Sequence, residues 1–232
     1  MADRILVVDD NKSICEILEF NLSNEGYKVE CAYSAEEALK KLNPQHALIL
    51  LDVMMGEMSG YKMAEKLRKE KNSIPIIFLT AKDTENDMLT GFSVGADDYI
   101  SKPFSIKEVI VRVKALLKRS EITQRGKEVV SDKNKLVFDE VIINLDTKEL
   151  IINNEVLPLT RTEFEIITLL ASNPSRLFGR EDIIDHIWKE TPYITERTVD
   201  VHIGRLRKKL GDKASLIVSR PGYGYRFNEP TQ

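Results

Sequence analysis

A run of five apolar residues ending in an acid, Ala47 to Leu51 followed by Asp52, most constrains how this chain folds. An unbroken apolar run of this length is typical of a strand that is buried on both faces, as in a parallel sheet. The acid then lies at the carboxyl edge of the sheet, where open α/β folds bind their ligands. Taken alone, Asp52 has a simpler interpretation as the first residue of a turn, and the rest of the chain decides between the two.

The same arrangement recurs along the first half of the chain. Strand-like segments at 4–8, 27–32, 47–52, 74–79 and 99–101 alternate with amphipathic segments at 11–24, 34–42, 60–71, 83–94 and 106–119. Five strands alternating with five helices predict an α/β fold with a doubly wound parallel sheet and right-handed crossovers. Polar residues that follow four of the strands then meet at one edge of the sheet, and these are Asp9, Asp10, Asp52, Thr80 and Lys102.

These residue types limit the chemistry of the predicted site. Three carboxylates repel one another, and their charged forms coexist only with a compensating cation. Their oxygens suit Mg²⁺, which also accepts phosphate oxygens, while Lys102 adds a positive charge and Thr80 a hydroxyl. One carboxylate can act as the nucleophile toward a phosphoryl group and form an aspartyl phosphate. The sequence has no Walker A motif or Gly-rich phosphate loop, which disfavours direct use of a nucleoside triphosphate.

The motifs Asp9-Asp10, Asp52, Thr80-Ala81, Tyr99 and Lys102-Pro103 resemble those of the receiver domain of bacterial response regulators. The resemblance covers about residues 1–120 and implies a flavodoxin-like five-stranded sheet of order 2-1-3-4-5. It implies that Asp52 is the phospho-acceptor and that the bond before Pro103 is cis. The implied Mg²⁺ ligands are Asp9, Asp10, Asp52 and the backbone carbonyl of Met54. The implied phosphate-binding and switch residues are Thr80, Ala81, Tyr99 and Lys102.

The resemblance also implies a homodimer on activation, formed through the fourth helix, the fifth strand and the fifth helix. The charged residues that match this dimer interface are Asp97, Asp98, Glu108, Arg112 and Arg119. Two residues depart from the family pattern. Met88 stands where a basic partner for Glu108 is expected, and Gly56 stands where proline usually follows the acceptor by four residues. Glycine makes that loop less rigid, so the lifetime of the phosphorylated state is left open.

Composition changes after residue 119. Residues 120–135 are polar and predict a flexible linker between a domain at 1–119 and a domain at 136–229. In the second domain, short alternating segments at 136–138, 141–145, 149–152 and 156–159 predict a small antiparallel sheet. Helices are predicted at 160–171 and 180–188, and from Thr195 or Glu196 to Leu210, followed by a hairpin made of 216–219 and 225–227.

The third of these helices has an apolar stripe on one face and basic residues on the other. Three helices with the last one basic, followed by a hairpin, predict an α+β winged helix-turn-helix that binds DNA. On charge alone, a solvated basic face is the alternative. The net charge of the chain is −3, so the basic excess is local. The strings 159–164, 197–210 and 222–227 resemble the effector domain of the OmpR/PhoB family over about residues 136–228.

This second resemblance implies which residues contact DNA. Arg205 is the candidate for reading a base. The candidate phosphate contacts are Arg197, Thr198, His202, Arg207 and Lys208, and the candidates in the hairpin are Arg220 and Tyr223. His202 has an alternative interpretation as a helix residue that packs locally. Two positions depart from the family, since Gly204 replaces a basic residue before Arg205 and Pro221 replaces a frequent arginine in the hairpin.

Together these patterns predict a two-component response regulator rather than an enzyme. Its expected partners are a sensor histidine kinase, double-stranded promoter DNA, RNA polymerase and a second copy of the chain. No apolar run is long enough to span a bilayer and the first residues lack a signal-peptide layout, so a cytoplasmic protein is expected. Two other functions stay open: a phosphatase that uses an aspartyl intermediate, and a DNA-binding regulator whose receiver no longer needs phosphate.

Overall fold

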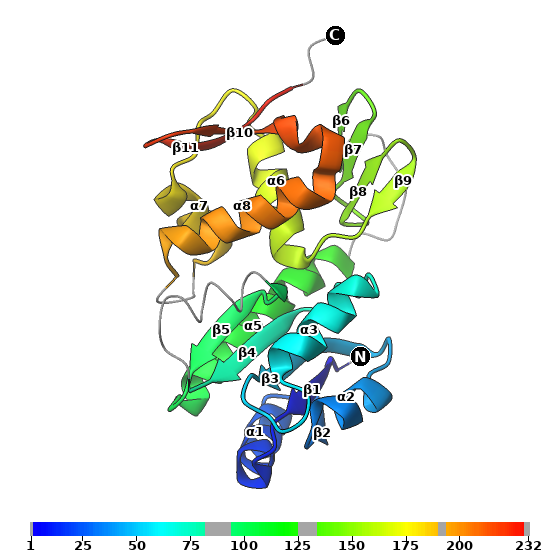
Figure 1. Cartoon of the computed structure of the whole chain (residues 1–232), viewed down its shortest axis with the longest axis vertical. Helices are drawn as coiled ribbons and strands as arrows, with labels where there is room; N and C mark the ends of the chain where they lie inside the picture. The colour runs from blue at the N-terminus through cyan, green and yellow to red at the C-terminus, as the bar shows by residue number, and fades with distance from the viewer. Residues whose placement is uncertain (1, 82–93, 125–133, 190–193, 230–232) are drawn as a thin grey trace. The chain divides into compact units, whose positions relative to one another are not determined.

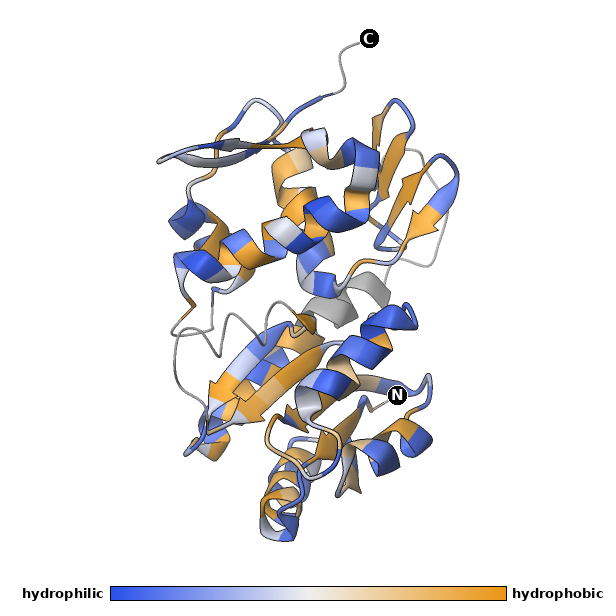
Figure 2. Ribbon diagram, viewed as in Figure 1, coloured by the Kyte–Doolittle hydropathy of each residue, from blue (hydrophilic) through white to orange (hydrophobic). Residues whose placement is uncertain are grey.

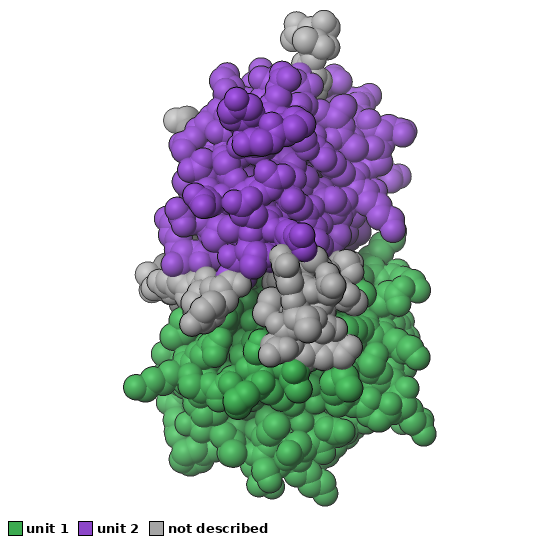
Figure 3. Space-filling view, turned by 60° about the vertical axis from the view of Figure 1, so that its left-hand side comes forward, with its two compact units in different colours: residues 1–119 green, residues 120–232 purple. Residues whose placement is uncertain are grey.

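The computed structural model describes residues 2–81, 94–124, 134–189 and 194–229, and for 118–124 it describes the backbone alone (Figure 1). The chain divides into two compact units, residues 1–119 and 120–232, which Figure 3 colours separately. Within the described parts, no helix combines the length and apolar character needed to cross a bilayer.

The first unit contains the predicted five-stranded parallel sheet, in the order β2-β1-β3-β4-β5. Its strands are β1 (Arg4–Val8), β2 (Lys28–Ala32), β3 (His46–Asp52), β4 (Ile76–Thr80) and β5 (Asp98–Ser101). Apolar residues fill β1, β3 and β4, and Figure 2 shows this hydrophobic character along the sheet. The register places Val8 opposite Leu51 and Asp52 opposite Leu79, which brings the ends of three strands to one edge.

The helices of this unit are α1 (Lys12–Asn24), α2 (Ala35–Lys41), α3 (Gly60–Lys69) and α5 (Ile106–Gln124). Asn11 caps α1 through its side-chain oxygen. Ser34 caps α2 by accepting from the backbone N–H of Glu37, while the Glu37 carboxylate accepts from the backbone N–H of Tyr33.

Two expectations about the helices need comment. The helix predicted at 83–94 lies outside the described residues except for Val94. Helix α5 continues past its predicted end at residue 119 to Gln124, so the first part of the predicted linker has a helical backbone. Residues 125–133 of the predicted linker lie outside the description.

The second unit begins with an antiparallel sheet of order β6-β7-β8-β9. Its strands are β6 (Lys135–Phe138), β7 (Val141–Asn144), β8 (Glu149–Ile152) and β9 (Glu155–Leu157). The elements that follow are α6 (Arg161–Ala171), α7 (Arg180–Ile187), α8 (Glu196–Leu210), the 3₁₀ helix η2 (Gly211–Leu216), and a hairpin of β10 (Ile217–Arg220) and β11 (Gly224–Phe227). Thr160 and Glu163 form a capping box at the start of α6.

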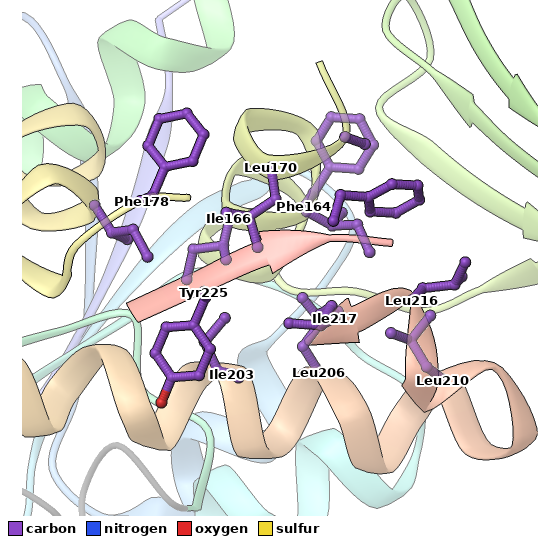
Figure 4. Close-up of a cluster of buried hydrophobic side chains, with 14 of the residues drawn as sticks. Phe164, Ile166, Leu170, Phe178, Ile203, Leu206, Leu210, Leu216, Ile217 and Tyr225 are labelled. Carbon is purple, nitrogen blue, oxygen red and sulfur yellow. The ribbon is translucent and has the colours of Figure 1, made fainter. Parts of the chain in front are cut away.

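Buried apolar side chains from α6, α8 and the β10–β11 hairpin form one core (Figure 4). Phe164 and Leu170 come from α6, Ile203 and Leu206 from α8, and Tyr225 from β11. The hairpin is therefore fixed to α8 through the shared core, which gives the winged helix-turn-helix arrangement that the sequence predicts.

Candidate functional site

Three carboxylates lie together at the carboxyl edge of the parallel sheet. Asp9 follows β1, Asp10 is its neighbour, and Asp52 is the last residue of β3. One ligand oxygen from each can be chosen so that all three lie within 4.8 Å of one another. Asp9 and Asp52 are buried and Asp10 is exposed, so the cluster opens to solvent on one side. Because β1 and β3 are adjacent parallel strands, their carboxyl ends lie side by side at the same edge of the sheet.

Lys102 reaches the same cluster from the loop after β5. Its Nζ lies 2.6 Å from Oδ2 of Asp9 and 3.1 Å from Oδ2 of Asp52. The peptide bond between Lys102 and Pro103 is cis, as predicted, and the Lys102 backbone N–H donates to the carbonyl of Thr80 at 2.6 Å. Three carboxylates and one ammonium leave the pocket with a net negative charge, which favours a further cation.

The protonation of these groups reflects their burial. Burial raises the pKa of the Asp52 carboxyl above its ordinary value; the charge of Lys102 opposes this rise, and that of Asp9 adds to it. For Lys102, burial lowers the pKa of the ammonium, but its hydrogen bond to Asp9 and the charges of Asp52 and Asp9 outweigh this, so the net shift is upward. Lys102 therefore stays charged at neutral pH and compensates part of the carboxylate charge.

The remaining predicted residues of this edge lie close by in the fold. Thr80 ends β4 and is fully buried, and Tyr99 on β5 is 5% exposed, so the ring points into the unit. Ala81 follows Thr80 and is exposed. The backbone N–H of Met54 donates to Oδ1 of Asp52 at 3.2 Å, which fixes the start of the loop after β3.

In the second unit, the candidate DNA-binding residues fall into two groups. Arg197 and Lys208 on α8 are exposed, and so are Arg220 and Tyr223 in the hairpin. Thr198 and His202 are buried, with 3% and 0% of their surface exposed. His202 packs against Trp188, with 5.5 Å between the ring centroids. The expectation that His202 contacts phosphate is therefore corrected in favour of the alternative, local packing, because α7 covers this face of α8.

Arg205 and Arg207 make contacts within the unit that the sequence did not predict. Arg205 forms an ion pair with the fully buried Glu163 of α6 at 3.1 Å, and Lys209 pairs with the other oxygen of Glu163 at 2.5 Å. Arg207 donates to the carbonyl of Ile217 at 2.7 Å and to the hydroxyl of Ser219 at 2.9 Å. Glu163 thus holds α8 to α6, and Arg207 holds α8 to the hairpin.

A second network at the start of α8 was also missed. Asp200 accepts from Nε of Arg180 at 2.7 Å and from the hydroxyl of Tyr225 at 2.6 Å. The guanidinium of Arg180 also lies over the Tyr225 ring. An acid on the otherwise basic helix is the signal that could have identified it.

Known proteins match both units. Residues 5–114 match the response regulator receiver domain, and residues 154–227 match the family described as transcriptional regulatory protein, C terminal. The chain is 39% identical to the uncharacterized transcriptional regulatory protein YclJ of Bacillus subtilis (strain 168), over 97% of this chain and 99% of the relative. Among solved structures, the response regulator DrrB, a Thermotoga maritima OmpR/PhoB homolog, is 28% identical with a TM-score of 0.51, covering 98% of this chain and 99% of that one. A RitR mutant is 27% identical with a TM-score of 0.75, covering 99% of this chain and 100% of that one.

This chain is an OmpR/PhoB-type response regulator. As a two-component regulator of this family, it combines a receiver domain with a DNA-binding domain for transcription. Its output domain is of the transcription-factor type and not of an enzymatic type.

Three of the charged residues expected at the receiver dimer interface of this OmpR/PhoB regulator pair with one another within the chain. Arg112 lies 2.8 Å from Asp98 and 2.9 Å from Glu108. Asp97 is fully buried and lies 3.3 Å from Arg68 of α3. Burial of Asp97 makes it a structural acid here, whereas the sequence suggested an interface residue. The side chain of Arg119 and all of Met88 lie outside the described residues.

Two glycines mark where this regulator departs from the family pattern. At Gly56, an added Cβ would meet nothing within 4 Å, so the loop after Asp52 is open as well as lacking the usual proline. At Gly204 on the exposed face of α8, an added Cβ would likewise meet nothing within 4 Å. Position 204 therefore has room for a side chain, and the basic contact is missing only because the residue is glycine.

Proposed function

We propose that this regulator accepts a phosphoryl group on Asp52 from a sensor histidine kinase, with Mg²⁺ bound at the same pocket. The observation that carries the proposal is the position of Lys102, 2.6 Å from Asp9 and 3.1 Å from Asp52 inside a cluster of three carboxylates. The residues that would hold the metal are Asp9, Asp10, Asp52 and the backbone carbonyl of Met54. When bound, Mg²⁺ would neutralise charge on the phosphoryl oxygens.

The residues of the chain perform the rest of the transfer. A carboxylate oxygen of Asp52 attacks phosphorus in line with the leaving group, and the kinase histidine departs as the new O–P bond forms. Lys102 is already within reach of Asp52 and pairs with the phosphate. The phosphoryl group carries about −1.5 to −2 charge at pH 7. The Thr80 hydroxyl then donates to a phosphoryl oxygen, and the Tyr99 ring fills the space that this motion leaves.

We further propose that this change favours a homodimer of receiver domains, which places two winged helices on tandem half-sites of promoter DNA. Dimerisation raises the effective concentration of the second DNA-binding domain at the promoter. The bound dimer then contacts RNA polymerase. The exposed side chains of Arg197, Lys208 and Arg220 support contact with phosphates of DNA.

Phosphorylation of an Asp52→Asn variant by a small phosphodonor tests the first proposal. We expect the Asp52→Asn protein to incorporate no phosphate, while Glu57→Gln in the same exposed loop incorporates as much as the native protein. Phosphate that persists on the Asp52→Asn protein would refute the assignment.

A pair of substitutions on α8 tests the DNA contacts. If Arg205 leaves Glu163 to read a base, Arg205→Ala should reduce discrimination by about 1–3 kcal/mol at one position of the site. Lys208→Ala should weaken binding to all sequences equally and reduce the salt slope by about 1. If Arg205→Ala instead weakens binding to all sequences equally, Arg205 contacts phosphate only. Both measurements use purified DNA of varied sequence over a range of salt concentrations.

A further inference from the structure

Two cysteines lie close together in the receiver domain, Cys15 on α1 and Cys31 on β2. Sγ of Cys31 lies 3.8 Å from the backbone carbonyl oxygen of Cys15. Both are free thiols in this structure. Their contact joins two elements that are separate in the chain, so the pair is placed by the fold and not by sequence proximity.

The two thiols differ in how they meet solvent. Cys15 is fully buried in the apolar core of the receiver, whereas Cys31 is partly exposed and lies on β2, the edge strand of the sheet. On its outer side, Cys31 lies 3.8 Å from a carboxylate oxygen of the exposed Glu19. A small oxidant therefore reaches Cys31 before the buried Cys15. The neighbouring Cys15, burial and the charge of Glu19 raise the pKa of the Cys31 thiol, so its oxidation is slow.

The pair is also linked to the acidic pocket through the backbone of Asp9. The Cys15 thiol donates to the Asp9 carbonyl at 3.3 Å. The Asp9 N–H donates to the carbonyl of Ala32, the residue after Cys31, at 3.2 Å. Both thiols therefore lie beside contacts that position Asp9, whose carboxylate pairs with Lys102.

We propose that Cys15 and Cys31 are a reversible oxidation site that forms an intramolecular disulfide on exposure to hydrogen peroxide. In the first step the Cys31 sulfur displaces water from the peroxide: the O–O bond breaks, an S–O bond forms, and Cys31 becomes a sulfenic acid. In the second step the Cys15 sulfur attacks the Cys31 sulfur: an S–S bond forms, the S–O bond breaks, and the hydroxide leaves as water with the thiol proton of Cys15. A small thiol reverses the reaction.

The disulfide removes the proton that Cys15 donates to the Asp9 carbonyl, and it ties α1 to β2 beside the pocket. Loss of a contact that orients a metal ligand typically weakens metal affinity by about 10–100-fold. Oxidation should therefore weaken Mg²⁺ binding at the pocket. This effect on Mg²⁺ rests on the proposed function, whereas the formation of the disulfide is independent of it.

The first experiment treats the reduced full-length protein with hydrogen peroxide, blocks the remaining thiols and maps the peptides by mass spectrometry without reduction. We expect one linked peptide pair containing Cys15 and Cys31, lighter by two hydrogens and separated by dithiothreitol. Cys31→Ser should abolish the link, and Cys15→Ala should leave Cys31 as a sulfenic acid that dimedone traps. If Cys15→Ala does not fold, comparison of the native protein with Cys31→Ser still shows whether the linked peptide pair forms. Oxidation of Cys31 to a sulfinic acid without a link, or links between chains only, would overturn the proposal.

The second experiment measures Mg²⁺ affinity by calorimetry in native protein before and after oxidation, with peroxide-treated Cys31→Ser as the control. We expect affinity to fall by about tenfold in the oxidised native protein and to be unchanged in the control. Equal affinity before and after disulfide formation would overturn the coupling to the pocket. If Mg²⁺ binds none of these proteins, the proposed metal site fails while the disulfide result stands.

Discussion

The burial of His202 in the fold changes the role assigned to this residue. The side chain was a candidate phosphate contact, but the structure buries it against Trp188. Burial holds the pKa of its imidazole well below 6.5, and the nearby charges of Arg205 and Lys209 lower it further. The ring is therefore neutral in the folded protein at neutral pH.

A dependence of stability on pH follows. In the unfolded chain His202 takes up a proton near pH 6.5, whereas the folded chain resists it, so the unfolded state binds more protons below that pH. The free energy of unfolding of the second unit should be highest above about pH 6.5. As the pH drops below 6.5, this free energy should decrease by up to about 1.4 kcal/mol per pH unit. Urea titrations followed by the fluorescence of Trp188, the one tryptophan, measure this. His202→Leu should flatten the slope, and an equally steep slope in that variant would contradict the explanation.

Alanine substitutions at Gly56, in the loop after Asp52, and at Gly60, the first residue of α3, should have opposite effects on stability. An alanine Cβ at Gly56 would meet nothing within 4 Å, whereas one at Gly60 would lie 2.1 Å from the carbonyl oxygen of Asp52. Gly56→Ala should therefore stabilise the first unit by about 0.4–1 kcal/mol, since it restricts the unfolded chain. Gly60→Ala should destabilise it by about 1–3 kcal/mol through overpacking. Chemical denaturation followed by circular dichroism compares them, and equal stability of the two variants would refute the close approach at Gly60.

At the scale of elements, the attachment of α8 to α6 depends on one buried acid. Glu163 pairs with both Arg205 and Lys209, and it also accepts the backbone N–H of Thr160 at 2.7 Å. Glu163→Gln retains the size of the side chain but leaves two cations without their shared anion. We expect a loss of about 3–5 kcal/mol in the stability of the second unit.

Glu140→Gln is the matched control for this substitution. Its partner Lys213 lies 2.6 Å away, but both side chains are well exposed to solvent, so the change should be small. Denaturation of the two variants under identical conditions makes the comparison. If Glu163→Gln is no more destabilising than Glu140→Gln, the buried pair does not hold the helices together.

These elements also show what could be predicted from the sequence. Asp9, Asp52, Thr80 and Lys102 were predictable as a group, because parallel strands bring their carboxyl ends to one edge whatever the details of packing. The pairing of Glu163 with Arg205 was not, since contacts between helices depend on how their side chains interdigitate. The sequence left the burial of His202 open for the same reason: the basic face of α8 is broad, and Trp188 of a different segment decides which part of it is covered.

At the scale of the whole molecule, the apolar cores described here are separate. One draws its buried residues from Ile5 to Leu117 and the other from Val141 to Phe227. We therefore expect two unfolding transitions, with Trp188 fluorescence reporting only the second unit. Acid should shift that transition alone, and saturating Mg²⁺ should stabilise the first unit alone, by about 2.7 kcal/mol at a hundred times its dissociation constant. A single transition that both treatments shift would contradict independent unfolding.

Gly204 has a consequence for the cell as well as for the helix. Each phosphate that a protein neutralises releases condensed cations from DNA, and each such contact steepens the fall of affinity with salt by a slope of roughly 0.9. Open space surrounds position 204, so an arginine there would fit and would add one contact. Without it, promoter occupancy should change less when internal potassium rises. Under osmotic stress, the native regulator should stay on its promoters at salt concentrations that release a Gly204→Arg variant of equal starting affinity.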